Sequence, residues 1–148
     1  MYLEQNLVNR YGLEPGDRIV VPKSSWNLVQ HHALYLGYNM NGEHLICENV
    51  IGIGVVLTRV SYFFKDVKSI TRIEKFKGNS LERKNVVQKA LQKLGQPYSL
   101  INYNCESFCN DILFNKPKSL QVQTGVFFGL VAFVLLMATS GENGQKSF

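Results

Sequence analysis

The sequence is poor in cysteine and proline, the residues that small secreted proteins and fibrous proteins use in large numbers. It contains three cysteines and four prolines in 148 residues. The number of cysteines is odd, and their spacing is not that of a disulfide framework; they are Cys47, Cys105 and Cys109. The opening residues, MYLEQNLVNRYG, show neither the basic start nor the apolar run of a secretory signal. We therefore expect reduced thiols in a cytosol-like compartment.

Internal repeats and low-complexity linkers are also absent. Hydrophobic residues make up 45% of the chain and aromatic residues 11%, which excludes a disordered polypeptide. The length is enough for one domain with a modest core. We expect that domain to span residues 1–116, and residues 117–148 to form a separate C-terminal segment.

Acidic residues are few, and positive charge is concentrated in one stretch. The formal net charge is +5. Residues 1–58 hold three basic and five acidic groups, for a net charge of −2. Residues 59–93 hold ten basic and three acidic groups, for a net charge of +7. Residues 94–148 hold three of each and are neutral overall. Such a stretch suggests contact with an anionic surface, either lipid headgroups or nucleic acid. Few aromatic residues, such as Phe63, Phe64 and Phe76, are interleaved with the basic ones, so no nucleic-acid partner is expected.

Charge is missing altogether from Ser119 to Gly141, and Gly125–Ala138 contains only glycine and apolar residues. A helix over Ser119–Ala138 would be about 30 Å long, roughly the thickness of a bilayer core. A buried core helix is the alternative. The lack of a polar stripe and the short polar tail GENGQKSF favour a single-pass C-terminal membrane anchor.

Two further features of this segment bear on topology and assembly. Lys116 and Lys118 precede it, so the positive-inside rule places the folded domain on the cytoplasmic side. Gly125 and Gly129 form a GxxxG pattern that would allow dimerisation through the membrane helix.

The first 116 residues predict strands followed by helices, an α+β arrangement with a small antiparallel sheet packed on helices. The turn Leu13–Asp17 contains proline and glycine. Apolar and β-branched runs between turns predict strands over Arg18–Val21, His31–Gly37, His44–Val50 and Lys68–Phe76. Ile51–Arg59, with two glycines, fits either another strand or a bulged turn. A capping pattern predicts one helix after Asn79, ending before Gly95, and a second beginning near Asn104.

The second helix would place Cys105 in its first turn. There the unpaired amide groups and the positive end of the helix dipole lower a thiol pKa, as a nucleophile requires. An ordinary half-buried cysteine is the alternative. Cys109, one turn later, and Cys47, in an apolar strand, are predicted to be packing residues.

A nucleophilic thiolate needs an imidazole beside it, and the chain has only His31, His32 and His44. His31 and His32 must point to opposite faces of their strand, so only one can face Cys105. His44 can approach that end only if the two strands are offset. No pair of these residues has the spacing of metal ligands, so neither a metal nor a cofactor is expected.

Three stretches, LEPGDRIVVP, HHALYLG with the following His44, and LGQPYSLINYNCESF, resemble the lecithin:retinol acyltransferase-like family. This family includes the HRAS-like suppressor phospholipases and acyltransferases. The similarity covers roughly residues 12–115. It implies a permuted papain-like fold related to NlpC-type peptidases, in which Cys105 is the nucleophile, His31 the general base and His44 the second histidine.

The chain departs from the family pattern in three places. Many members have a histidine at the position of Ser107, and some have a tyrosine at the position of Val29. The loop before His44 is longer by one residue. These departures leave the substrate range open.

Together, these features predict a membrane-anchored thiol acyltransferase or phospholipase A that acts on glycerophospholipid acyl esters through a Cys105 acyl-enzyme. A cysteine peptidase or amidase of the same broad fold is one alternative. A non-catalytic, membrane-tethered interaction module is the other.

Overall fold

The computed structural model describes residues 2–23, 29–126, 128–130 and 132. The chain divides into two units, Met1–Lys118 and Ser119–Phe148. The elements of the first unit are, in chain order, α1 (Tyr2–Tyr11), β1 (Arg18–Pro22), β2 (Gln30–Tyr38), β3 (His44–Val50), β4 (Gly54–Arg59), α2 (Val60–Phe63), β5 (Arg72–Glu74), α3 (Ser80–Gln92) and α4 (Cys105–Phe114).

The five strands form one sheet in the order β4-β3-β2-β1-β5, and every neighbouring pair is antiparallel. The α+β class and the antiparallel sheet are therefore as predicted. Two helices, α1 and α2, are not among the predicted elements, and β5 is shorter than the run over Lys68–Phe76 suggested.

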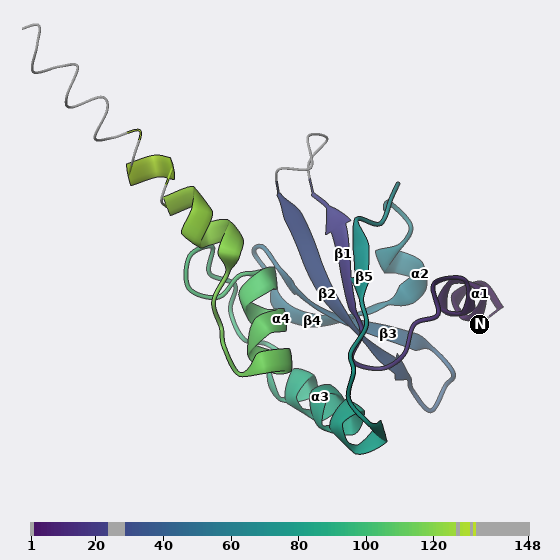
Figure 1. Ribbon diagram of the computed structural model, residues 1–148. Helices are drawn as coiled ribbons and strands as arrows, with labels where there is room; N and C mark the ends of the chain where they lie inside the picture. Colours follow the sequence, from purple (N-terminus) through teal and green to yellow (C-terminus); the bar gives the residue numbers. More distant parts are fainter. Residues whose placement is uncertain (1, 24–28, 127, 131, 133–148) are drawn as a thin grey trace, which may run out of the picture. The chain divides into compact units, whose positions relative to one another are not determined.

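Both faces of the sheet are buried beneath helices (Figure 1). Because side chains alternate along a strand, Leu34 and Leu36 of β2 point to one face while Ala33 and Tyr35 point to the other. Helices α3 and α4 cover the first face, and α1 and α2 cover the second. The sheet is thus the middle layer of three.

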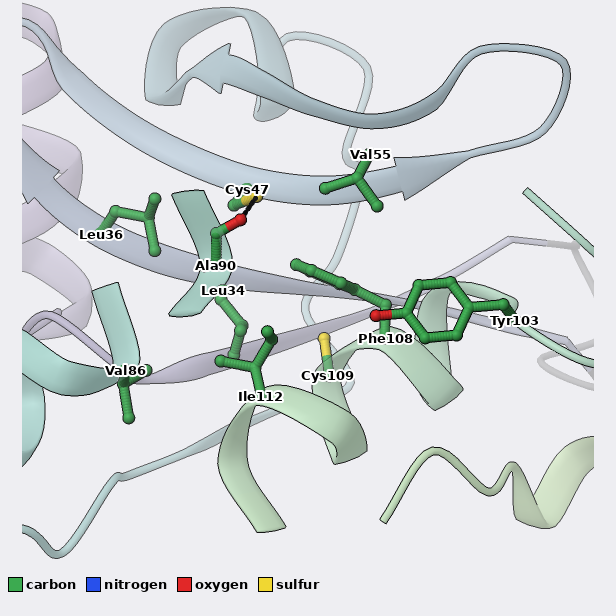
Figure 2. Close-up of a cluster of buried hydrophobic side chains, with 10 residues drawn as sticks. All are labelled: Leu34, Leu36, Cys47, Val55, Val86, Ala90, Tyr103, Phe108, Cys109 and Ile112. Carbon is green, nitrogen blue, oxygen red and sulfur yellow. Dashed lines mark hydrogen bonds between the residues drawn. The ribbon is translucent and has the colours of Figure 1, made fainter. Parts of the chain in front are cut away.

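Figure 2 shows the core beneath α3 and α4. Phe108, Cys109 and Ile112 of α4 are almost completely buried against the strands. Cys47 and Cys109 both lie in this cluster with no exposed surface, as predicted for packing residues. This packing fixes α4, and with it the residue at its first position, against β2 and β3.

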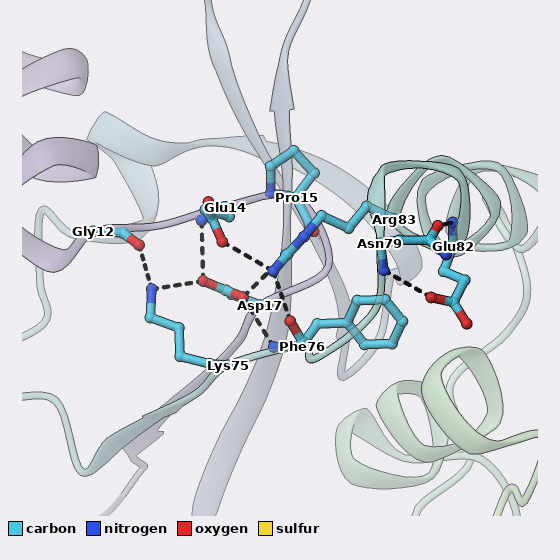
Figure 3. Close-up of polar contacts among 9 residues, drawn as sticks. All are labelled: Gly12, Glu14, Pro15, Asp17, Lys75, Phe76, Asn79, Glu82 and Arg83. Atoms are coloured by element: carbon cyan, nitrogen blue, oxygen red, sulfur yellow. Dashed lines mark hydrogen bonds and ion pairs between the residues drawn. The ribbon is translucent and has the colours of Figure 1, made fainter.

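A buried carboxylate ties the loop before β1 to the loop before α3 (Figure 3). Asp17 is fully buried and forms ion pairs with Lys75 (2.8 Å) and Arg83 (3.4 Å). It also accepts hydrogen bonds from the backbone N–H groups of Glu14 and Phe76. Every oxygen of this carboxylate therefore has a partner, which offsets the cost of burying its charge.

The basic stretch over residues 59–93 spans several elements of the first unit. Its residues are distributed over α2, β5 and α3 and the loops that join them. Half of its ten cations form ion pairs with acidic residues of the same unit, namely Arg59, Arg72, Lys75, Arg83 and Lys93. Much of the local excess charge is therefore neutralised within the fold.

The predicted membrane helix over Ser119–Ala138 falls partly on residues 127, 131 and 133–138, which lie outside the described residues. Residues 120–126 are helical. Within the part of the chain that the structure describes, no helix is both long enough and apolar enough to cross a membrane.

Candidate active site

Cys105 is the first residue of α4, as the capping pattern predicts. The side-chain oxygen of Asn104 accepts hydrogen bonds from the backbone N–H of Ser107 (2.9 Å) and from its hydroxyl (3.0 Å). The side-chain amide of Asn104 donates to the carbonyl of Leu100. Cys105 therefore lies in a fixed first turn, where the helix dipole favours a negative charge.

The start of α4 lies where β2 and β3 separate. The register between these strands ends at Ala33↔Glu48, so the earlier residues of β2 do not pair with β3. The Cys105 thiol instead donates to the carbonyl of Gln30 (3.7 Å) and is hydrogen bonded to the backbone N–H of His32. Across the gap, the Asn49 side chain of β3 donates to the carbonyl of Tyr103 at 2.7 Å. The loop before α4 is thus held from both strands.

This placement brings Cys105 to His31. The His31 ring is hydrogen bonded to the Cys105 side chain, and its Nε2 lies 2.7 Å from a carboxylate oxygen of Glu48. Because Nε2 faces Glu48, Nδ1 is the ring nitrogen left for the thiol. The His31 and Glu48 side chains are only 15% and 11% exposed. The three groups form a chain from thiol to imidazole to carboxylate.

The environment favours the charged forms of both reacting groups. Burial lowers the pKa of His31, but the hydrogen bonds and charges of Cys105 and Glu48 outweigh it and raise the pKa to about 9. Burial raises the pKa of Cys105, but the hydrogen bond and charge of His31, the His32 N–H and the Lys23 charge together lower it. Both shifts favour a thiolate paired with an imidazolium, the form in which a cysteine is most nucleophilic.

A family model described as lecithin retinol acyltransferase matches residues 12–118. The chain belongs to the lecithin retinol acyltransferase family. The matched range contains every element from β1 to α4 and all three groups of the thiol–imidazole–carboxylate chain. No curated protein and no solved structure gives a significant match.

The family resemblance predicts His44 as the second histidine, but the structure does not bring it to His31. His44 pairs with Tyr38, seven residues beyond His31 along β2. At about 3.3 Å per residue this separation is roughly 23 Å. The His44 ring instead contacts the Tyr35 hydroxyl through Nδ1 (2.6 Å) and the Gln5 carbonyl oxygen through Nε2 (3.1 Å). It therefore joins α1 to the sheet.

Glu48 occupies the place expected for His44 beside the His31 ring. It also accepts a hydrogen bond from the Thr58 hydroxyl of β4, which fixes the second carboxylate oxygen. The charge and hydrogen bonds of His31 and the Thr58 hydroxyl lower the pKa of Glu48, against the opposing effect of burial. In this member of the lecithin retinol acyltransferase family, the imidazole thus faces an ionised carboxylate.

The signal for Glu48 in the sequence is its alternation with His44. Residues 44, 46 and 48 share one face of β3, so either Glu48 or His44 could face His31, depending on the register. The observed register pairs Glu48 with Ala33 and His44 with Tyr38, which brings Glu48 to the level of His31. A strand register is a long-range feature that the sequence of one strand does not show.

His32 points to the opposite face of β2 from His31, as strand geometry requires. It is 2% exposed, and burial together with the Arg18 charge lowers its pKa to about 4. Its ring is therefore neutral at physiological pH. Its backbone N–H is hydrogen bonded to the Cys105 sulfur.

Two other observations complete the site. Tyr98 lies close enough to Cys105 for the thiolate charge, added to burial, to raise its pKa. Among the described residues, no group of three or more His, Cys, Asp or Glu side chains is placed to hold a metal ion.

Proposed function

We propose that this chain is a thiol acyltransferase or phospholipase A that takes an acyl group from a glycerophospholipid ester. The observation that supports this proposal best is the Cys105–His31 pair at the start of α4, in a chain of the lecithin retinol acyltransferase family. The lowered thiol pKa and raised imidazole pKa describe a nucleophile and a proton donor in the same hydrogen bond.

The first half-reaction transfers the acyl group to sulfur. The Cys105 thiolate attacks the ester carbonyl carbon, a C–S bond forms, and negative charge moves to the carbonyl oxygen. Backbone N–H groups in the first turn of α4 would stabilise that oxyanion. The C–O bond then breaks, and the His31 imidazolium gives its proton to the departing lysophospholipid oxygen. A thioester and a neutral imidazole remain.

The second half-reaction reverses these roles. Neutral His31 takes a proton from water, an amine or an alcohol as its O or N attacks the thioester carbonyl. The C–S bond breaks and the thiolate is restored beside an imidazolium. Water as the acceptor gives a free fatty acid, and an amine or alcohol gives acyl transfer.

Glu48 takes the orienting role in this proposal. Its carboxylate holds Nε2 of His31 at 2.7 Å, which turns Nδ1 toward sulfur and stabilises the imidazolium. We assign His44 a structural role between α1 and β3, because its ring contacts Tyr35 and Gln5.

We also propose that the charge-free segment beginning at Ser119 anchors the protein in a membrane as a single C-terminal span, with Met1–Lys118 on the cytoplasmic side. The supporting features are the uncharged sequence Ser119–Gly141 and the two lysines just before it. GxxxG at Gly125 and Gly129 would permit dimers of this span.

The function is tested by incubating the full chain with phospholipid vesicles and measuring fatty acid release and acyl transfer by lipid mass spectrometry. Wild type and Cys109→Ala, a matched cysteine variant inside the core, should both be active, and Cys105→Ala should be inactive. Cleavage of peptides without any action on lipids would instead identify a cysteine peptidase or amidase. Inactivity on every substrate, with a slowly alkylated Cys105, would identify a non-catalytic module.

A further inference from the structure

The end of the sheet that holds Cys105 is surrounded by exposed apolar side chains. Five of them, called the apolar rim below, come from three separate segments: Val29 at the start of β2, Ile51 and Ile53 in the β3–β4 turn, and Leu100 and Ile101 in the loop before α4. Their exposed fractions are 49%, 55%, 67%, 67% and 67%. Large apolar side chains this exposed, gathered around one site, mark an interaction surface.

Backbone contacts hold these three segments beside Cys105. The β3–β4 turn meets the loop before α4, because the N–H of Gly95 donates to Val55 and the N–H of Val55 donates to Gln96. Gly54 (φ +96°) allows this approach, since a Cβ atom there would lie 2.5 Å from the Gln96 carbonyl oxygen.

The other two segments lie next to Cys105 and its helix cap. The carbonyl oxygen of Gln30, which follows Val29, lies 3.7 Å from the Cys105 sulfur, and the Leu100 carbonyl accepts a hydrogen bond from the Asn104 side chain. Val29 and Leu100 of the apolar rim therefore adjoin the candidate active site.

The sequence around the rim is free of acidic residues. Residues 49–58 and 94–105 carry no charge, and residues 24–42 carry no acidic group. Lys23 is exposed and close enough for its charge to lower the Cys105 pKa. An uncharged apolar ring with a lysine beside it matches the boundary of a bilayer, where acyl chains lie just below phosphate groups.

The burial of Cys105 suggests what the apolar rim would do in the proposed reaction. Cys105 is 5% exposed, so a lipid ester must leave the headgroup layer to reach the sulfur. An apolar path from the hydrocarbon region to the thiol would keep the acyl chain out of water during that movement.

We propose that the apolar rim inserts into the acyl region of a phospholipid bilayer, so that Cys105 faces the membrane and receives its substrate from it. This inference deepens the proposed function and rests on it. It locates the lipid contact in the rim rather than in the basic stretch over residues 59–93.

The test uses full chains with Cys105→Ala, which removes the reactive thiol while Cys47 and Cys109 stay buried. Leu100→Cys and Leu81→Cys are each labelled with bimane. Both native leucines are 67% exposed, but Leu81 lies on α3. The labelled proteins are mixed with phosphatidylcholine–phosphatidylserine vesicles that carry brominated acyl chains. Bromine should quench the label at position 100 at least threefold more than the label at position 81.

Equal quenching at the two positions, or none at position 100 on vesicle-bound protein, would overturn the insertion. A second variant, Leu100→Ser/Ile101→Ser, should lower the rate on vesicles about tenfold, and Leu81→Ser should leave it within twofold. Wild-type inactivity on lipid together with quenching at position 100 would reject the proposed function but keep the insertion. Activity on lipid without quenching at position 100 would keep the proposed function and reject the insertion.

Discussion

Nε2 of His31 and a carboxylate oxygen of Glu48 lie 2.7 Å apart, on adjacent strands of the sheet. Both side chains are largely buried, and the other nitrogen of the same ring is turned to the Cys105 thiol. The contact therefore couples a fixed negative charge to the Cys105 thiol through one imidazole. It also explains how a chain without a second histidine at this position can hold the ring in place.

Replacing Glu48 with glutamine should lower the upper pH limit of activity. The reactive ion pair exists above the lowered Cys105 pKa and below the His31 pKa of about 9. Since the Glu48 charge helps to raise the His31 pKa, its loss moves the alkaline limit to lower pH. The rate of fatty acid release from phospholipid vesicles against pH measures this. An unchanged alkaline limit would contradict the orienting role of Glu48.

His31 and His44 should respond differently to alanine. His31→Ala removes the proton donor and should lower kcat by about 10²–10⁴-fold. His44→Ala should cost about 1–2 kcal/mol of stability, because Tyr35 and Gln5 lose a buried partner, and should leave kcat within about twofold. Kinetics and urea unfolding of both variants check this. If His44→Ala lowered kcat as much as His31→Ala, the structural role assigned to His44 would be wrong.

The two asparagine caps provide a matched pair. Asn104 caps α4 beside Cys105, and Asn79 caps α3 on the same unit. Alanine at either position should lower the free energy of unfolding by about 1 kcal/mol. Only Asn104→Ala should also raise the Cys105 pKa, which would slow alkylation at pH 7 by about 3–10-fold. Equal alkylation rates in the two variants would show that the start of α4 does not activate the thiol.

Asp17→Ala should be among the more destabilising single substitutions on the first unit. It leaves Lys75, Arg83 and two backbone N–H groups without the carboxylate that joins them (Figure 3). Breaking such a buried pair costs about 3 kcal/mol. Thermal unfolding would measure the loss. Glu82→Ala, an exposed change in the neighbouring capping box, should cost less than about 1 kcal/mol.

Local sequence patterns predict many of the helices and strands of the first unit. The start of α4 can be read from Asn104 and the apolar spacing after Cys105, because a helix cap depends on residues a few positions apart. The strands β1 to β4 follow from apolar runs between turns in the same way. The short strand β5 is less predictable, since it owes its conformation to pairing with β1 across more than fifty residues.

The part of the site that the sequence did not predict depends on long-range register. Both His44 and Glu48 lie on β3, and the register that pairs Glu48 with Ala33 and His44 with Tyr38 decides which of them lies near His31. The separation of β2 from β3 beyond Ala33, which admits Cys105, is also a tertiary feature. Neither is encoded in the spacing of the reacting residues.

The central claim is that Cys105 carries an acyl group during the reaction. Its most direct test is intact-protein mass spectrometry of the full chain, quenched in acid during turnover of phosphatidylcholine vesicles that contain one kind of acyl chain. We predict a mass increase of one acyl group, removed by hydroxylamine as expected for a thioester, mapped to Cys105 and absent from Cys105→Ala. Release of fatty acid with no adduct on wild type, or an adduct that persists in Cys105→Ala, would contradict the account.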